Sequence, residues 1–168
     1  MKKIMHTMLF IAIFIAMNSC SADTAEGSDT NPASSEQLIT DYTYNDSELE
    51  TMQLINNYRT SIGLKALERI NHISYKCQEH NNYMITNNVV DHNDFVLRSA
   101  NIENVLSAKR VGENVAYNYK TSEAALKAWL DSPGHKANIE GDYTHFGISV
   151  TTDPATGKKY YTNIFAKI

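Results

Sequence analysis

Apolar residues recur at helical spacing in four stretches of the chain, and they alternate with polar residues in two stretches near its end. The first stretch, SELETMQLINNYRTSIG, spans residues 47–63 and repeats apolar residues every three to four positions. Ser47 and Glu50 have the spacing of a capping box, and Gly63 suits the position after a helix. The pattern predicts a first helix that begins near Ser47.

Three further helices are predicted downstream. Residues 70–88 and residues 96–106 carry apolar side chains near helical period. Residues 121–131 form the fourth predicted helix, which has Thr121 as its N-cap and Trp129 on its buried face. The Pro-Gly pair at 133–134 predicts that this helix ends and that the chain turns there.

Two strands are predicted at the end of the chain. Residues 144–152 and residues 158–167 alternate in polarity, and DPATG at 153–157 has the composition of a hairpin loop. Helices followed by a β-hairpin favour an α+β fold built in layers. The length from residue 47 to residue 168 is that of one domain.

The N-terminal residues have the pattern of an export signal. Lys2 and Lys3 precede an apolar run at 8–17, which is too short for a membrane-spanning helix. The run ends at MNSCS, which resembles a bacterial lipobox with Cys20 as the lipid-modified residue. We interpret residues 1–19 as a lipoprotein signal peptide. The alternative is an ordinary cleaved signal peptide followed by an unmodified cysteine.

Residues 20–46 are predicted to be an acidic, disordered tether. From residue 21 to residue 46 there are six acidic residues and no lysine or arginine, among many Ser, Thr, Asn and Ala. The expected domain at 47–168 has 13 acidic and 13 basic residues, so the net charge of −4 belongs to the tether. A neutral domain argues against nucleic acid as a partner, because nucleic acids require a basic face.

The chain has two cysteines, and if Cys20 carries lipid then only Cys77 remains. The domain is therefore expected to fold without a disulfide. Cys77 falls on the apolar face of the second predicted helix, and we interpret it as a small buried residue. His80 on the same helix is interpreted as a partly buried helix residue without a catalytic role.

Three polar residues at the edges of predicted elements are candidates for chemistry: His92 in DHNDF, Glu113 in VGENVAY and His135 in SPGH. Two imidazoles and a carboxylate can bind zinc with an open coordination position. Glu113 can equally orient a histidine as an acid–base pair without a metal. Each residue also has a purely structural explanation. His92 can be a hydrogen-bond donor in a loop, Glu113 a cap for the following backbone, and His135 a solvent-exposed turn residue. The spacing of the three in the sequence does not show that they meet.

Six segments in this order resemble the signatures of the CAP superfamily, whose domains are also called SCP-like. They are INNYRTSIGLKAL, DHNDF, VGENVAYNY, AWLDSPGHKANI, THFGISV and YYTNIFA. The resemblance covers residues 47–168 and is closest to bacterial members, which lack disulfides. It implies a three-layer α–β–α sandwich of the CAP type with a C-terminal β-hairpin.

The resemblance also implies a cleft lined by histidine and glutamate. The matching positions here are His92, Glu113 and His135. Asn114, beside Glu113, is a further cleft candidate, either as a support for Glu113 or as a simple turn residue. Many members have a tetrad of two His and two Glu, but this chain has His135 in place of one Glu and Tyr160 in place of one His. Zinc is the cofactor implied, with His92, Glu113 and His135 as its ligands.

The function predicted from the sequence is an extracytoplasmic, membrane-anchored lipoprotein of the bacterial cell envelope. The protein is expected to attach to the membrane through lipid on Cys20. Its cleft is expected to bind a ligand of the envelope, which is a lipid, glycan or peptide. The alternative is a hydrolase of envelope glycan or peptide that uses Glu113 and a histidine, with or without metal. A third interpretation is a scaffold with no ligand. One fold supports many functions, so the ligand itself is not identified.

Overall fold

The structure is a computed structural model that describes residues 37–168. The predicted signal peptide, Cys20 and residues 21–36 lie outside the described residues. Within residues 37–168, no helix is both long enough and apolar enough to cross a membrane.

A four-stranded sheet forms the middle layer, with the strand order β1-β3-β4-β2. β2, β4 and β3 are antiparallel neighbours, and the short β1 runs parallel to β3. The strands are β1 (Glu68–Arg69), β2 (Arg110–Tyr117), β3 (His145–Thr152) and β4 (Lys159–Lys167). The predicted terminal hairpin is therefore confirmed, whereas β1 and β2 join it from earlier in the chain.

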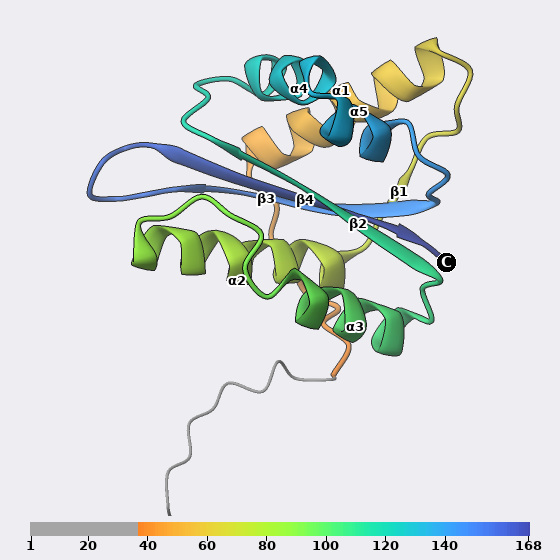
Figure 1. Ribbon diagram of the computed structural model, residues 1–168, viewed down its shortest axis with the longest axis horizontal. Helices are drawn as coiled ribbons and strands as arrows, with labels where there is room; N and C mark the ends of the chain where they lie inside the picture. Colours follow the sequence, from red (N-terminus) through yellow and green to blue (C-terminus); the bar gives the residue numbers. More distant parts are fainter. Residues whose placement is uncertain (1–36) are drawn as a thin grey trace, which may run out of the picture. The chain divides into compact units, whose positions relative to one another are not determined.

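Five helices cover the two faces of this sheet (Figure 1). On one face lie α1 (Asp46–Ser61), α4 (Ser122–Asp131) and α5 (Pro133–Ile139). On the other lie α2 (Asn71–Asn87) and α3 (Phe95–Leu106). The predicted α–β–α sandwich is confirmed, and because helices cover both faces, β4 in the middle is buried on both of its sides.

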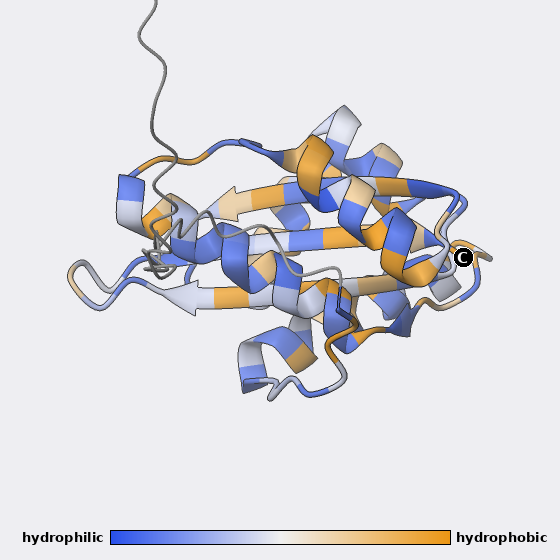
Figure 2. Ribbon diagram, turned by 90° about the horizontal axis from the view of Figure 1, so that it is seen from below, coloured by the Kyte–Doolittle hydropathy of each residue, from blue (hydrophilic) through white to orange (hydrophobic). Residues whose placement is uncertain are grey.

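Each layer boundary has its own apolar core. Trp129, Tyr161 and Phe165 belong to the core between the sheet and α1, α4 and α5, and Ile73 and Cys77 belong to the core beneath α2. Figure 2 shows hydrophobic and hydrophilic residues following one another along the strands. Cys77 is fully buried, as predicted, and its burial raises the pKa of the thiol well above the usual value. Such a thiol is unreactive.

The first helix begins one residue earlier than predicted and uses a different cap. The Asn45 side chain accepts from the Glu48 backbone N–H at 3.0 Å, and the Glu48 carboxylate accepts from the Asn45 N–H at 2.9 Å. This is a complete capping box. The predicted box is wrong because the Glu50 carboxylate instead accepts from the Ser122 hydroxyl on α4 at 2.7 Å.

Pro133 starts a helix as well as following one. The fourth predicted helix is confirmed, with Thr121 as the N-cap of α4. The turn predicted after it is the short helix α5, which has Pro133 at its first position. Proline fits there because the first N–H of a helix has no partner in any case. His135 therefore lies in the first turn of α5 and not in an open turn.

The last residues of the expected tether pack against the domain. The Ile39 backbone N–H donates to His72 Nδ1 at 3.1 Å, and the Tyr42 hydroxyl donates to the Glu48 carboxylate at 2.8 Å. The Tyr44 hydroxyl lies 3.0 Å from the Ser74 hydroxyl on α2. The predicted domain boundary at residue 47 is therefore too late, because the aromatic residues in DYTYND offset the polar composition around them.

Side chains form hydrogen bonds with the backbone groups along the edge of β3 that the short β1 does not cover. The Ile148 N–H donates to the Ser74 hydroxyl at 3.1 Å. The Val150 N–H donates to the Glu48 carboxylate at 2.9 Å, and the Val150 carbonyl accepts from the Asn45 side chain at 3.0 Å. The residues that cap α1 therefore also close this edge of the sheet.

The opposite edge, formed by β2, is covered in the same manner. The Asn138 side chain on α5 donates to the Glu113 carbonyl at 3.1 Å. The Trp129 indole on α4 donates to the Val115 carbonyl at 3.0 Å. These bonds fix α4 and α5 over the strand that carries Glu113.

Candidate functional site

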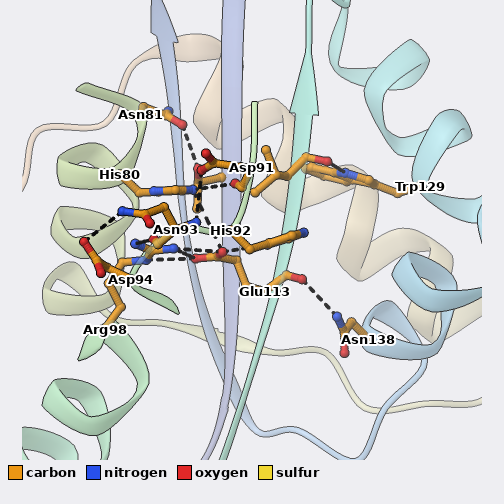
Figure 3. A network of polar contacts seen from close by, with 12 residues as sticks. His80, Asn81, Asp91, His92, Asn93, Asp94, Arg98, Glu113, Trp129 and Asn138 are labelled. Atoms are coloured by element: carbon orange, nitrogen blue, oxygen red, sulfur yellow. Dashed lines mark hydrogen bonds and ion pairs between the residues drawn. The ribbon is translucent and has the colours of Figure 1, made fainter. Parts of the chain in front are cut away.

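Glu113 is the centre of a buried polar network (Figure 3). It projects from β2 toward α3 and is 6% exposed. Oε1 accepts from His92 Nδ1 at 2.8 Å and from Arg98 Nη2 at 2.9 Å, while Oε2 accepts from Arg98 Nε at 2.9 Å. The guanidinium binds the carboxylate through two parallel bonds, which is the strongest ion-pair geometry available to these groups. We call Glu113, His92, Arg98 and His80 the Glu113 network.

The loop between α2 and α3 positions His92 and Arg98. Asp94 takes a left-handed conformation, with φ of 56°, and the chain then enters α3. The Phe95 N–H donates to the His92 carbonyl at 3.0 Å, and Arg98 Nη1 donates to the Asn93 carbonyl at 2.7 Å. Arg98 therefore fixes both the carboxylate and the loop that presents His92.

His80 belongs to α2, and its side chain is fully buried. Its Nε2 lies 2.9 Å from the Asp91 carbonyl, to which it donates, and 4.0 Å from Glu113 Oε1. Burial and the charge of Arg98 lower the pKa of His80, although Glu113 acts in the opposite direction. His80 is therefore neutral near pH 7, and its Nδ1 has no hydrogen-bond partner within residues 37–168.

His92 is the member of the network that faces solvent, with a side chain 50% exposed. Its bond to Glu113 raises the pKa of the imidazole, although burial and Arg98 act in the opposite direction. Since Nδ1 binds the carboxylate, Nε2 is the ring nitrogen left to meet a ligand. It is a donor when the ring is protonated and an acceptor when the ring is neutral.

His135 lies near the network but does not bind Glu113. Burial and repulsion from His92 lower the pKa of His135. Its carbonyl accepts from the Asn114 side chain at 3.0 Å, and Asn114 Oδ1 accepts from Asn138 at 2.9 Å. Asn114 is thus a supporting residue that fixes α5 to β2, while His92 and Glu113 form the only bonded pair within the predicted trio.

Tyr160 does not belong to this site. It lies opposite Tyr117 in the pairing of β2 with β4, whereas Glu113 lies opposite Ile164. The Tyr160 side chain is 2% exposed and packs in an apolar cluster with Met84. Its predicted place in the cleft is wrong because the strand register places it opposite Tyr117, the last residue of β2, four residues along from Glu113.

The arrangement does not fit the zinc site that the sequence predicts. Both oxygens of Glu113 already accept hydrogen bonds, and the guanidinium of Arg98 would lie next to a dication. Within residues 37–168, no three His, Cys, Asp or Glu side chains are grouped so that they can hold a metal ion. His92, Glu113 and His135 are therefore not a metal site in this conformation.

Comparison with known proteins agrees with the fold and the order of the segments. Residues 52–165 match the sequence profile of CAP, the cysteine-rich secretory protein family. The chain belongs to the CAP family. A similar protein, the uncharacterized membrane protein YlbC of Bacillus subtilis, is 35% identical over 125 residues, covering 72% of this chain and 34% of YlbC. Another, YkwD of the same organism, is 32% identical over 109 residues, covering 60% of this chain and 41% of YkwD.

Solved structures share the fold at lower identity. An outer surface protein of Borrelia burgdorferi has a TM-score of 0.63 at 16% identity, and the match covers 77% of this chain and 98% of that protein. An extracellular SCP-domain protein of Bacillus anthracis has a TM-score of 0.63 at 24% identity, and the match covers 73% of this chain and 40% of that protein. The chain spans well under half the length of the curated Bacillus relatives, so their whole-protein functions do not transfer directly.

Sequence reasoning misses two members of the Glu113 network. His80 is predicted to be a partly buried helix residue, but it is 2% exposed and lies beside Glu113. Arg98 is not among the predicted site residues, although it is the only cation in helix α3. A lone arginine three residues after the start of a helix, close behind a candidate histidine, is the signal that could have found it.

Proposed function

We propose that this CAP domain is a binding module of the cell envelope, anchored outside the cytoplasm by lipid on Cys20. The Glu113 network would hold a ligand or partner through His92. The main support for this proposal is that Arg98 and His92 form hydrogen bonds to both oxygens of the Glu113 carboxylate. A carboxylate held in this manner orients a neighbouring group but is not free to take up a substrate proton.

The ligand group that suits this site is a hydrogen-bond acceptor. Protonated His92 offers an N–H from Nε2, and its raised pKa favours that form. Glu113 offsets the charge of Arg98 beneath it, so protonated His92 gives the network a net positive charge at its exposed side. Polar groups of a lipid headgroup, a glycan or a peptide carbonyl all have this chemistry.

One observation favours hydrolysis as the second candidate. The bond from His92 Nδ1 to Glu113 is the arrangement in which a carboxylate orients an imidazole, and neutral His92 would then have Nε2 as a general base. The substrate would be envelope glycan or peptide. No metal enters this alternative, since the residues do not fit one.

The anchor is tested by replacing Cys20 with Ala. One lipid-modified cysteine would carry the whole attachment, so the variant is expected in the soluble fraction after export, whereas the parent chain remains with membranes. Fractionation followed by immunoblotting measures this. A variant that stays in the membrane fraction after a high-salt wash would show that Cys20 is not the anchor.

The site is tested with the exported chain carrying Cys20→Ser, which is free of lipid. Wild type, His92→Ala and the control His145→Ala are mixed separately with insoluble cell-wall material and with phospholipid vesicles, and the bound fraction is measured by sedimentation. We expect His92→Ala to bind one of these at least about tenfold more weakly, because a charge-assisted hydrogen bond is lost. His145 lies on β3, outside the Glu113 network, so His145→Ala should bind like wild type.

The same samples separate binding from hydrolysis. Soluble fragments released from cell-wall material are measured by mass spectrometry. Fragments that wild type releases and His92→Ala does not would establish the hydrolase and overturn the binding module. Equal sedimentation of all three proteins would overturn the role of the Glu113 network in either function.

A further inference from the structure

A pocket of about 570 Å³ lies at the C-terminal end of α1, away from the Glu113 network. It is formed by Arg59, by residues 63–66 and Glu68 on the way into β1, by residues 140–144, which join α5 to β3, and by Lys167 of β4. None of its lining residues belongs to the Glu113 network. Its volume is within the range of sites that hold small ligands.

Arg59, in the last turn of α1, lines this pocket and is only 2% exposed. Its Nε donates to the Lys65 carbonyl at 2.9 Å. Its Nη1 donates to the Ile139 carbonyl at 2.6 Å and to the Gly141 carbonyl at 3.1 Å. These bonds join α1 to the end of α5 and offset the partial negative charge of its last carbonyls. They leave Nη2 unused.

Nη2 is the one guanidinium nitrogen of Arg59 that these bonds leave over, on a residue that lines the pocket. It donates to no group within residues 37–168. It is also absent from the buried side-chain atoms that lack a partner, which within those residues are His80 Nδ1 and Asn163 Oδ1. Nη2 is therefore not fully enclosed, and Arg59 lines this pocket although the residue is only 2% exposed.

No carboxylate lies within ion-pair distance of Arg59 within the described residues. The three acids that line the pocket have other neighbours. The exposed carboxylate of Glu68 lies 3.7 Å from His145 Nε2. Asp142 binds Lys167 at 2.6 Å, and Glu140 accepts from Tyr58 at 2.5 Å. Asp142 is exposed and acts on Arg59 only as a distant opposite charge. The buried guanidinium therefore has no direct counter-charge.

Lys65 supplies a second cation at the same place. It lines the pocket, its own carbonyl accepts from Arg59, and its ammonium forms no ion pair within residues 37–168. Leu64 and Tyr143 add apolar surface to the wall. A guanidinium keeps its charge at physiological pH, so an incoming anion would meet two unpaired cations beside an apolar surface.

We propose that this pocket binds the carboxylate of a small ligand between Arg59 Nη2 and Lys65 Nζ. The two N–H groups of Nη2 and the ammonium match the two oxygens of a carboxylate, and the apolar wall accommodates a short side chain. This site is separate from the Glu113 network, so neither proposal depends on the other. A phosphate ion shares the oxyanion chemistry, and the experiment distinguishes the two.

The experiment follows backbone amide signals of the exported chain with Cys20→Ser during titration with three probes. N-acetylalanine carries the carboxylate, N-acetylalanine amide is its neutral analogue, and inorganic phosphate is the other oxyanion. We expect saturable shifts at residues 63–66 and 140–144 with N-acetylalanine and none with its amide. Equal shifts with acid and amide, tighter binding of phosphate, or no saturable shift with any probe would each overturn the carboxylate site.

Variants at Lys65 test the contacts without breaking the bonds of Arg59 to the backbone. Lys65→Gln is expected to weaken binding of N-acetylalanine roughly two- to fivefold, because it removes one exposed charge. Lys65→Glu places a carboxylate next to Arg59 and should abolish binding. The control is Lys127→Gln, on the exposed face of α4, which should bind like wild type. Unchanged binding by Lys65→Glu would overturn the proposal.

Discussion

At the scale of single residues, Glu113 decides whether the buried charge of Arg98 is compensated. The guanidinium side chain is 10% exposed, and the carboxylate is its only ion-pair partner within the described residues. We expect Glu113→Gln to lower the free energy of unfolding by about 3 kcal/mol, because removing one partner leaves a buried charge without compensation. Urea denaturation of the variant and wild type measures the difference.

A double variant serves as the control for this prediction. Replacing the pair together, by Glu113→Leu and Arg98→Met, removes both charges and retains apolar volume. We expect it to recover most of the lost stability, since a buried ion pair is often no better than apolar packing of similar size. If Glu113→Gln is as stable as wild type, Arg98 is compensated by water and the network is not rigid.

The bond between His92 and Glu113 makes stability depend on pH in a defined direction. Because the pKa of His92 is raised above 6.5 in the folded state, its contribution is fully present below pH 6.5 and is lost as the pH rises through the folded pKa. His72, His80 and His135 have lowered pKa values, so their contributions are instead lost as the pH falls below 6.5.

The difference between wild type and His92→Gln isolates His92 from the other histidines. We expect wild type to be more stable at pH 5.5, by less than about 1 kcal/mol because the ring is half exposed, and the difference to vanish near pH 8.5. Urea denaturation of both proteins across this range measures it. A difference that grows with pH would contradict the assigned bond.

At the scale of single elements, the start of α1 is set by tertiary contacts of Asn45 and not by the local pattern at Ser47. Asn45 caps α1 and also donates to Val150 on β3. Asn45→Ala is therefore expected to cost about 1–2 kcal/mol. Ser47→Ala, at the cap that the sequence predicts, should cost less than about 0.5 kcal/mol. Thermal unfolding of both variants checks this, and the reverse ranking would restore the cap predicted from sequence.

Helices and strands with strong periodicity could be predicted from the sequence, and those made by tertiary contacts could not. The apolar spacing in α2 and α4 predicts their bounds within one or two residues, as do the alternating positions in β3 and β4. The strand β1 has two residues and exists only because it pairs with β3. The apolar spacing likewise does not show that Pro133, which follows α4, begins α5.

The candidate site was predictable to the extent that motifs mark it. His92 and Glu113 meet as the family resemblance implies, because the loop before α3 and the strand β2 lie side by side. Arg98 was missed because an ion pair depends on helix orientation, which spacing does not reveal. Tyr160 was misplaced because strand register, and not motif order, decides which side chains are neighbours.

At the scale of the whole molecule, the domain includes the residues just before its first helix. A chain that begins at residue 47 loses the Tyr42 and Tyr44 contacts and the cap at Asn45. Compared with a chain that begins at residue 37, we expect it to be less stable by about 2–4 kcal/mol, which lowers the melting temperature by roughly 6–12 °C. Equal melting temperatures by calorimetry would show that residues 37–46 are not part of the folded unit.

The closed edges of the sheet have a consequence for how copies of this protein behave when crowded. Another chain that added a strand beside β3 would first have to displace Asn45 and Glu48, and one beside β2 would have to displace Trp129 and Asn138. Exposed strand edges are the templates from which fibrils and tangled oligomers grow. Without them, copies at high local concentration can touch, exchange neighbours and separate again without fusing into aggregates.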